Sequence, residues 1–84
     1  MIKCVIDFKQ SYDLSTATTV ALKSGVDPLD IRTSFQPLKD MYRFVGYFET
    51  KAHARQFIDK LLSCSIRLEN MKIHHRNRLK ERKK

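Results

Sequence analysis

The amino-acid sequence predicts a single α+β domain in which one antiparallel sheet carries two helices. Three observations predict it. Apolar residues recur at every second position in several segments, which is the period of a half-buried strand. Two other segments have apolar residues at the three- and four-residue spacing of a helix. The chain has 84 residues, which leaves room for one hydrophobic core and excludes a second folded domain.

The first predicted strand covers residues 2–9. Apart from Val5, its apolar residues alternate with polar ones, and they are Ile2, Cys4, Ile6 and Phe8. A side-chain period of two places one row on the core and the other row on the opposite face of the sheet. We therefore expect Lys3 and Asp7 to point away from the core.

A helix is predicted next, ending at 23–25. Three residues near its start are suitable N-caps: Ser11, Asp13 and Ser15. The buried stripe would contain Leu14, Ala17, Val20, Ala21 and Ser24. The segment also holds four β-branched residues, Thr16, Thr18, Thr19 and Val20. Because β-branching disfavours helix, a strand is the alternative for this segment.

Two more strands follow a connector in which Pro28 forces the preceding residue out of helical geometry. Residues 31–36 alternate in polarity and form the second strand. Residues 41–49, MYRFVGYFE, are rich in aromatic and β-branched residues and form the third. The short turn at 39–40 makes these two strands antiparallel.

A second helix is predicted after Thr50, its N-cap. Its apolar stripe is Ala54, Phe57, Ile58, Leu61 and Leu62. Its solvent face is Lys51, His53, Arg55, Gln56, Asp59 and Lys60. A turn at 69–70 then leads into a last strand that ends near His75.

This order of elements, β-α-β-β-α-β, is that of a ferredoxin-like domain: a four-stranded antiparallel sheet with two helices on one face. We assign residues 1–75 to the domain and 76–84 to a basic C-terminal arm. In the usual strand order 4-1-3-2, the first and third strands are central. The face without helices would carry Lys3, Val5, Asp7, Arg32, Ser34, Gln36, Met41, Arg43, Val45, Tyr47, Lys72 and His74.

The formal net charge is +8, and most of it lies at the C-terminal end. The segment 76–84, RNRLKERKK, contains six basic residues and one acidic residue. It has too little apolar surface to offset the entropy of ordering it, so we expect a mobile arm. The basic surplus favours phosphate-bearing or other anionic partners, and a purely solubilising tail is the alternative.

These features favour a small regulatory protein that binds RNA or DNA, with RNA preferred because single-stranded bases can lie on an open sheet. Tyr47 would stack on a base while neighbouring cations and the arm bind phosphates. The predicted nucleic-acid-binding residues are Lys3, Arg32, Arg43, Tyr47, Lys72, His74, Arg76, Arg78, Lys80, Arg82, Lys83 and Lys84. Alternatively, an apolar group on the same face forms a homodimer interface or packs beneath the arm: Val5, Met41, Val45 and Tyr47.

Other site types have little support in the sequence. Cys4 and Cys64 belong to no CxxC pair, so we expect two reduced thiols packed as small apolar side chains in a cytoplasmic protein. No metal site and no cofactor are expected, because the spacing of zinc ligands is missing. The chain has no run of 18 apolar residues, and charges at Asp7 and Lys9 interrupt any signal-peptide core, so no membrane partner is expected.

The segments MYRFVGYFETKAHARQFIDKLL and LENMKIHH resemble the second half of an RNA-recognition-motif domain. The third strand ends in an aromatic residue, Phe48, and Ala54 follows six residues on. An apolar helix, a short turn and a final strand complete the spacing. The resemblance implies RNA binding and assigns no base-stacking residue. The spacing of Val45, Gly46, Phe48 and Ala54 is also similar to that of the peptidoglycan-binding SPOR domain.

Two alternatives belong to other functional classes. Asp7 at the end of the first strand makes the chain similar to small CRISPR-associated endoribonucleases and related toxins. That resemblance implies a catalytic Asp7 holding Mg²⁺ across a dimer, and one of His74 and His75 could act as a general acid or base. The second alternative is a modulator that docks on an acidic partner or a ribonucleoprotein. It would use the arm and the basic helix face of Lys51, His53, Arg55 and Lys60.

Overall fold

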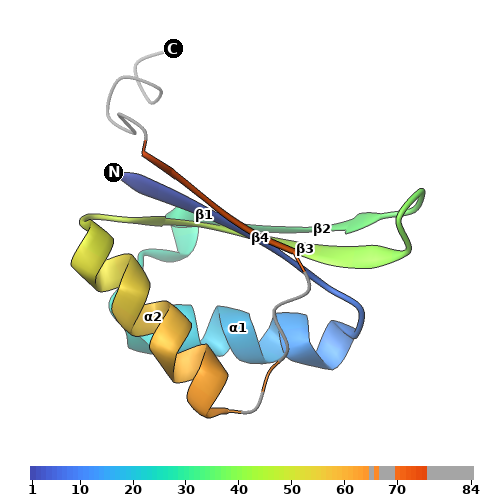
Figure 1. Cartoon of the computed structure of the whole chain (residues 1–84), viewed down its shortest axis with the longest axis horizontal. Coiled ribbons are helices and arrows are strands. Elements are labelled where there is room, and N and C mark those ends of the chain that lie inside the picture. Colours follow the sequence, from blue (N-terminus) through green and yellow to red (C-terminus); the bar gives the residue numbers. More distant parts are fainter. Residues whose placement is uncertain (65, 67–69, 76–84) are drawn as a thin grey trace.

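The computed structural model describes residues 1–64, 66 and 70–75, and it confirms an α+β fold with an antiparallel sheet and two helices. The predicted arm, 76–84, lies outside the described residues. The elements, in chain order, are β1 (Ile2–Phe8), α1 (Ser11–Lys23), the 3-10 turn η1 (Pro28–Asp30), β2 (Ile31–Gln36), β3 (Met41–Phe48), α2 (Lys51–Ser63) and β4 (Asn70–His75). Both helices lie on the same face of the sheet (Figure 1).

The strands are ordered β2-β3-β1-β4, and every neighbouring pair is antiparallel. β1 and β3 therefore occupy the centre. Their register places Cys4 opposite Gly46 and Asp7 opposite Arg43. Residues that face each other across an antiparallel pair lie on the same side of the sheet, so this register fixes which side chains share each face.

The core lies between the sheet and the helices. The buried residues on its two sides are Ile2, Cys4, Ile6, Phe8, Phe44 and Phe48 from the strands and Ala17, Ala21, Ala54, Phe57, Ile58 and Leu61 from the helices. The Phe57 ring contacts the rings of Phe44 and Phe48, with centroids 5.3 and 4.9 Å away. Gly46 stands between these strand aromatics on the same row. A Cβ there would lie 2.8 Å from Phe44 Cζ, so the glycine makes room for the ring.

Helix α1 forms despite its β-branched residues, and the strand alternative is wrong. The hydroxyls of Thr16, Thr18 and Thr19 each donate to the carbonyl four residues earlier, at 3.0–3.1 Å. In this way the polar groups are satisfied within the helix. None of the predicted caps acts as one: the N-cap is Gln10, without a side-chain hydrogen bond.

The C-terminus of α1 is closed by its backbone. The N–H of Gly25 donates to the carbonyl of Leu22, and the N–H of Val26 donates to that of Ala21. This pair of bonds is a Schellman motif, which needs a left-handed residue after the cap. Gly25 supplies it, with φ of +92°.

Two residues of α2 differ from the prediction. Leu62 is 54 % exposed, because its neighbour Leu61 takes the position that points into the core. His53 is partly buried rather than on the solvent face. Its Nε2 lies 2.7 Å from the carbonyl oxygen of Ser24, at the end of α1, and its ring edge meets Phe48. The predicted cap is confirmed, because Thr50 Oγ1 accepts a hydrogen bond from the N–H of His53 at 3.1 Å.

Both cysteines are free thiols, as predicted, but only one is packed in the core. Cys4 is fully buried, and desolvation raises the pKa of its thiol to about 12. Cys64 is exposed, because it caps the C-terminal end of α2. The prediction that both thiols pack as apolar side chains is therefore wrong for Cys64.

Candidate nucleic-acid interface

The candidate site is the face of the sheet turned away from α1 and α2. Strand alternation and register place ten described residues on it: Lys3, Val5, Asp7, Arg32, Ser34, Gln36, Met41, Arg43, Val45 and Tyr47. We refer to this surface as the open face, because neither described helix lies over it (Figure 1). The alternation in the sequence is enough to predict this grouping, since the strands contain no change of register.

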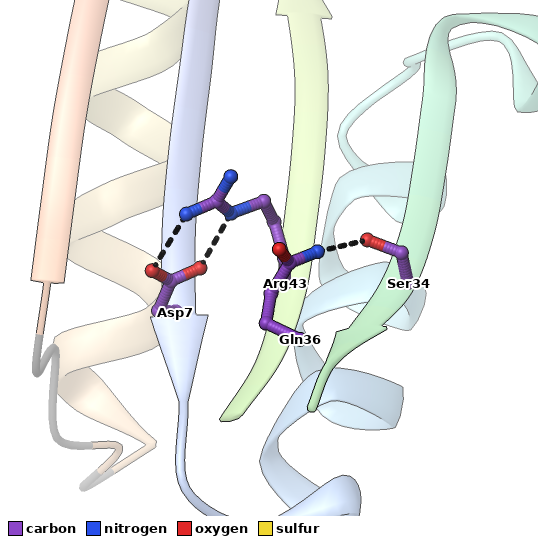
Figure 2. Close-up of polar contacts among 4 residues, drawn as sticks. All are labelled: Asp7, Ser34, Gln36 and Arg43. Carbon is purple, nitrogen blue, oxygen red and sulfur yellow. Dashed lines mark hydrogen bonds and ion pairs between the residues drawn. The ribbon is translucent and has the colours of Figure 1, made fainter. Parts of the chain in front are cut away.

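The centre of the open face is an ion pair between Asp7 of β1 and Arg43 of β3. Arg43 Nε donates to Asp7 Oδ1 at 2.8 Å, and its Nη2 donates to Oδ2 at 3.1 Å (Figure 2). The Asp7 side chain is 4 % exposed and that of Arg43 is 31 % exposed. Two parallel hydrogen bonds from one guanidinium to one carboxylate make a strong ion pair and fix the orientation of the two side chains.

This pair sets the electrostatics of the open face. The hydrogen bond with Asp7 and the attraction of its charge raise the pKa of Arg43 above its ordinary value, although partial desolvation opposes the shift. The guanidinium therefore stays charged and neutralises Asp7. The remaining cations, Lys3 and Arg32, face no other acidic side chain among the ten described residues of the open face.

The same geometry bears on the endoribonuclease alternative. Both carboxylate oxygens of Asp7 already accept hydrogen bonds from Arg43, so a metal ion at Asp7 would have to displace the guanidinium. Displacement would break both charge-assisted hydrogen bonds and would hold a divalent cation close to the positively charged guanidinium. Over the described ranges, no group of three or more His, Cys, Asp or Glu side chains is placed to hold a metal ion. The geometry favours a structural role for Asp7.

The β2 side of the open face is polar and accessible. Arg32 and Ser34 are exposed, and Gln36 Nε2 donates to Ser34 Oγ at 3.0 Å (Figure 2). Lys3 lies on β1, two strands away from Arg32, and is half-buried. Strands are spaced by about 4.8 Å, so the Cα atoms of these two residues are on the order of 10 Å apart across the sheet. They thus mark two separate points at which an extended anion could be held.

Tyr47, the predicted stacking residue, lies on the open face but is only 8 % exposed. Met41 is equally buried. A ring with so little exposed surface cannot offer its face to a base without moving. The open face thus favours contacts with phosphate over stacking. Sequence alternation gives the face on which a residue lies, but it does not give the cover that neighbouring side chains provide.

Of the remaining predicted binding residues, two lie in β4 and the others fall outside the described residues. In β4, Lys72 is in register with Val5 and His74 with Lys3, so both positions adjoin the open face. The arm residues Arg76, Arg78, Lys80, Arg82, Lys83 and Lys84 are outside the described residues.

A second basic surface lies on the outer side of α2. Lys51, Arg55 and Lys60 are exposed there, whereas His53 turns inward toward α1. Neither of the helices that the structure describes is long and apolar enough to cross a membrane.

Comparison with known proteins gives no family assignment: the sequence matches no protein-family model and no curated protein. Fold and site together define a small basic α+β domain with a cationic sheet face.

Proposed function

We propose that this chain is a ferredoxin-like, RNA-preferring nucleic-acid-binding protein with a regulatory role, which holds the phosphate backbone on its open face. The strand order β2-β3-β1-β4 supports the ferredoxin-like assignment. The resemblance of the second half of the chain to RNA-recognition-motif domains supports the preference for RNA.

One observation carries the proposal. The single acidic side chain among the ten described residues of the open face, Asp7, is paired with Arg43 at 2.8 Å. The face has three cations and one anion, so its formal charge is +2. Lys3 and Arg32 therefore dominate its potential, and the excess charge of the whole chain, +8, steers polyanions toward the molecule.

The mode of binding follows from what is exposed. Cations without an accessible aromatic ring bind phosphates and release condensed counterions, which makes affinity salt-dependent and largely independent of base sequence. Each phosphate contact on a single strand lowers the log–log salt slope by about 0.7. The arm, with six cations, would add a slope of about −4 if all of them contact phosphates.

The test compares two variants that lose the same charge from different surfaces. Lys3→Ala with Arg32→Ala removes two cations from the open face, whereas Lys51→Ala with Arg55→Ala removes two from α2. Binding to fluorescent single-stranded RNA and DNA is measured by anisotropy at about 50 and 200 mM salt. Affinity that depends on phosphate contacts falls strongly between these two concentrations. The open-face variant should bind more weakly than the α2 variant, and its log–log salt slope should be less negative by about 1.4.

Equal losses in the two variants would show that total charge rather than the open face determines binding. A chain ending at His75 measures the contribution of the arm separately. If nucleic acid bound to neither the wild type nor the variants at low salt while the chain formed a stable complex with a protein, the modulator alternative would hold. Magnesium-dependent cleavage of the RNA, lost in Asp7→Ala, would support the endoribonuclease alternative instead.

A further inference from the structure

Strand β2 forms an edge of the sheet, and within the described part of the chain no strand lies on its outer side. Its four middle residues, 32–35, are all exposed. Edge strands are commonly protected by several charges, a proline or a bulge. β2 has one charge, Arg32, pairs one-to-one with β3, and meets Pro37 only after its end. Its outer backbone edge is therefore available for pairing.

Exposed apolar side chains gather around this edge. Of the six large apolar residues exposed in the described part of the chain, three lie within positions 29–38. Leu29 is 77 % exposed just before β2, Phe35 is 45 % exposed within it, and Leu38 is fully exposed in the turn after it. Apolar side chains at both ends of an open edge favour a partner that can cover both ends at once.

A second copy of β2 meets that requirement. A two-fold axis at Thr33 would pair the strands antiparallel, with Ile31 opposite Phe35 of the second copy and Arg32 opposite its Ser34. Thr33 of one chain would lie opposite Thr33 of the other. Each apolar residue would then face an apolar residue, and Leu29 of each chain would approach the turn at 37–38 of the other. Such self-complementarity is what a two-fold interface requires.

Neighbouring registers are less favourable. An axis at Arg32 would place two arginines directly opposite each other, which is destabilising. An axis at Ser34 would place Phe35 opposite Thr33 and leave Ile31 without a partner on the other strand. The side-chain pattern of β2 thus selects the register centred on Thr33.

We propose that two copies of this chain associate through β2, forming one continuous antiparallel sheet with both open faces on the same side. The area that an edge of six residues can bury is small compared with the roughly 1,600 Å² buried in a standard interface. The dimer is therefore concentration-dependent. Because both chains carry a charge of +8 and Arg32 lies near the axis, added salt should strengthen the dimer, the reverse of its effect on polyanion binding.

The test uses the full chain in sedimentation experiments over a range of concentrations. Thr33→Lys and Thr33→Glu each place like charges opposite one another at the axis. Thr19→Lys, at a threonine of α1 that is also exposed, is the matched control. The wild type and Thr19→Lys should dimerise, each Thr33 variant alone should be monomeric, and an equimolar mixture of Thr33→Lys and Thr33→Glu should recover the dimer.

A cross-link gives a second readout that does not depend on charge. In a Cys64→Ser background, Thr33→Cys should form a disulfide-linked dimer under mild oxidation, because opposed residues in antiparallel strands have Cα atoms about 4.5–5.5 Å apart. Thr19→Cys should not. The proposal is overturned if the wild type is monomeric at every concentration, if Thr33→Lys dimerises like the wild type, or if the mixture stays monomeric. None of these outcomes depends on nucleic-acid binding.

Discussion

Replacing Arg43 by alanine should destabilise the fold more than replacing its partner does. The Asp7 side chain is 4 % exposed, so Arg43→Ala deprives a desolvated carboxylate of the two hydrogen bonds at 2.8 and 3.1 Å. Breaking a buried pair in this way costs about 3–5 kcal/mol. Asp7→Asn leaves the charge on Arg43, which is 31 % exposed and can be hydrated, so we expect about 1–2 kcal/mol.

The assay is urea unfolding followed by far-UV circular dichroism. The free energy of unfolding falls by about 1 kcal/mol per molar urea. The expected loss of stability therefore lowers the urea midpoint by roughly 3–5 M for Arg43→Ala and by about 1–2 M for Asp7→Asn. Arg55→Ala, at an exposed position on α2, is the control and should change stability by no more than about 0.5 kcal/mol. Combining Asp7→Leu with Arg43→Leu should recover much of the loss, because no charge is then buried.

A role for Arg43 in stabilising the buried carboxylate is refuted if Arg43→Ala costs no more stability than Arg55→Ala, or if Asp7→Asn costs more than Arg43→Ala. Either result would mean that the stability of the buried carboxylate does not depend on this guanidinium.

Three further predictions concern the core. Gly46→Ala should destabilise the fold by about 1–3 kcal/mol in the same assay, because the added Cβ would lie 2.8 Å from Phe44 Cζ, and an undiminished midpoint would contradict this packing. His53→Ala should cost about 1–2 kcal/mol by removing the contact with the Ser24 carbonyl at 2.7 Å, while Lys51→Ala, also in the first turn of α2, should be near neutral. Burial raises the pKa of the Cys4 thiol to about 12 in the fold, against an ordinary value of 9.0, so the unfolded chain loses the proton first. Stability is therefore fully present below pH 9 and should fall by up to about 1.4 kcal/mol per unit as the pH rises toward 12. Cys4→Ala should abolish that slope, and in the native protein a thiol reagent should label Cys64 alone.

The strands and the main core residues are predictable from the sequence because periodicity reports which row of side chains meets the core. Ile2, Ile6 and Phe57 are buried as their spacing predicts. The pairing of Asp7 with Arg43 cannot be predicted in the same way, since the two residues are 36 positions apart and their contact depends on the register between β1 and β3. The residues were expected at the centre of one face, but their contact requires the structure.

The other wrong predictions share a cause: the period of a helix or strand does not include contacts with residues outside that element. The helical period of α2 places His53 on its outer side, yet the side chain turns inward and contacts the carbonyl of Ser24, the residue after α1. The threonines of α1 have poor helix propensity, yet their hydroxyls bond within the helix. The exposure of Phe35 and the burial of Tyr47 likewise depend on neighbouring elements rather than on alternation.

Nucleic-acid binding and β2 pairing, if both occur, should be linked through Arg32. The two copies of Arg32 near the axis repel each other, and a polyanion crossing the axis would neutralise both at once. Binding of a long strand would therefore favour the dimer, and by reciprocity dimerisation would tighten binding of strands long enough to reach both open faces. Thr33→Lys should remove this dependence on probe length while Thr19→Lys, with the same added charge, preserves it. Anisotropy titrations with a short and a long probe of equal base composition measure the difference. If the two variants show the same advantage for the long probe, the two open faces do not act together.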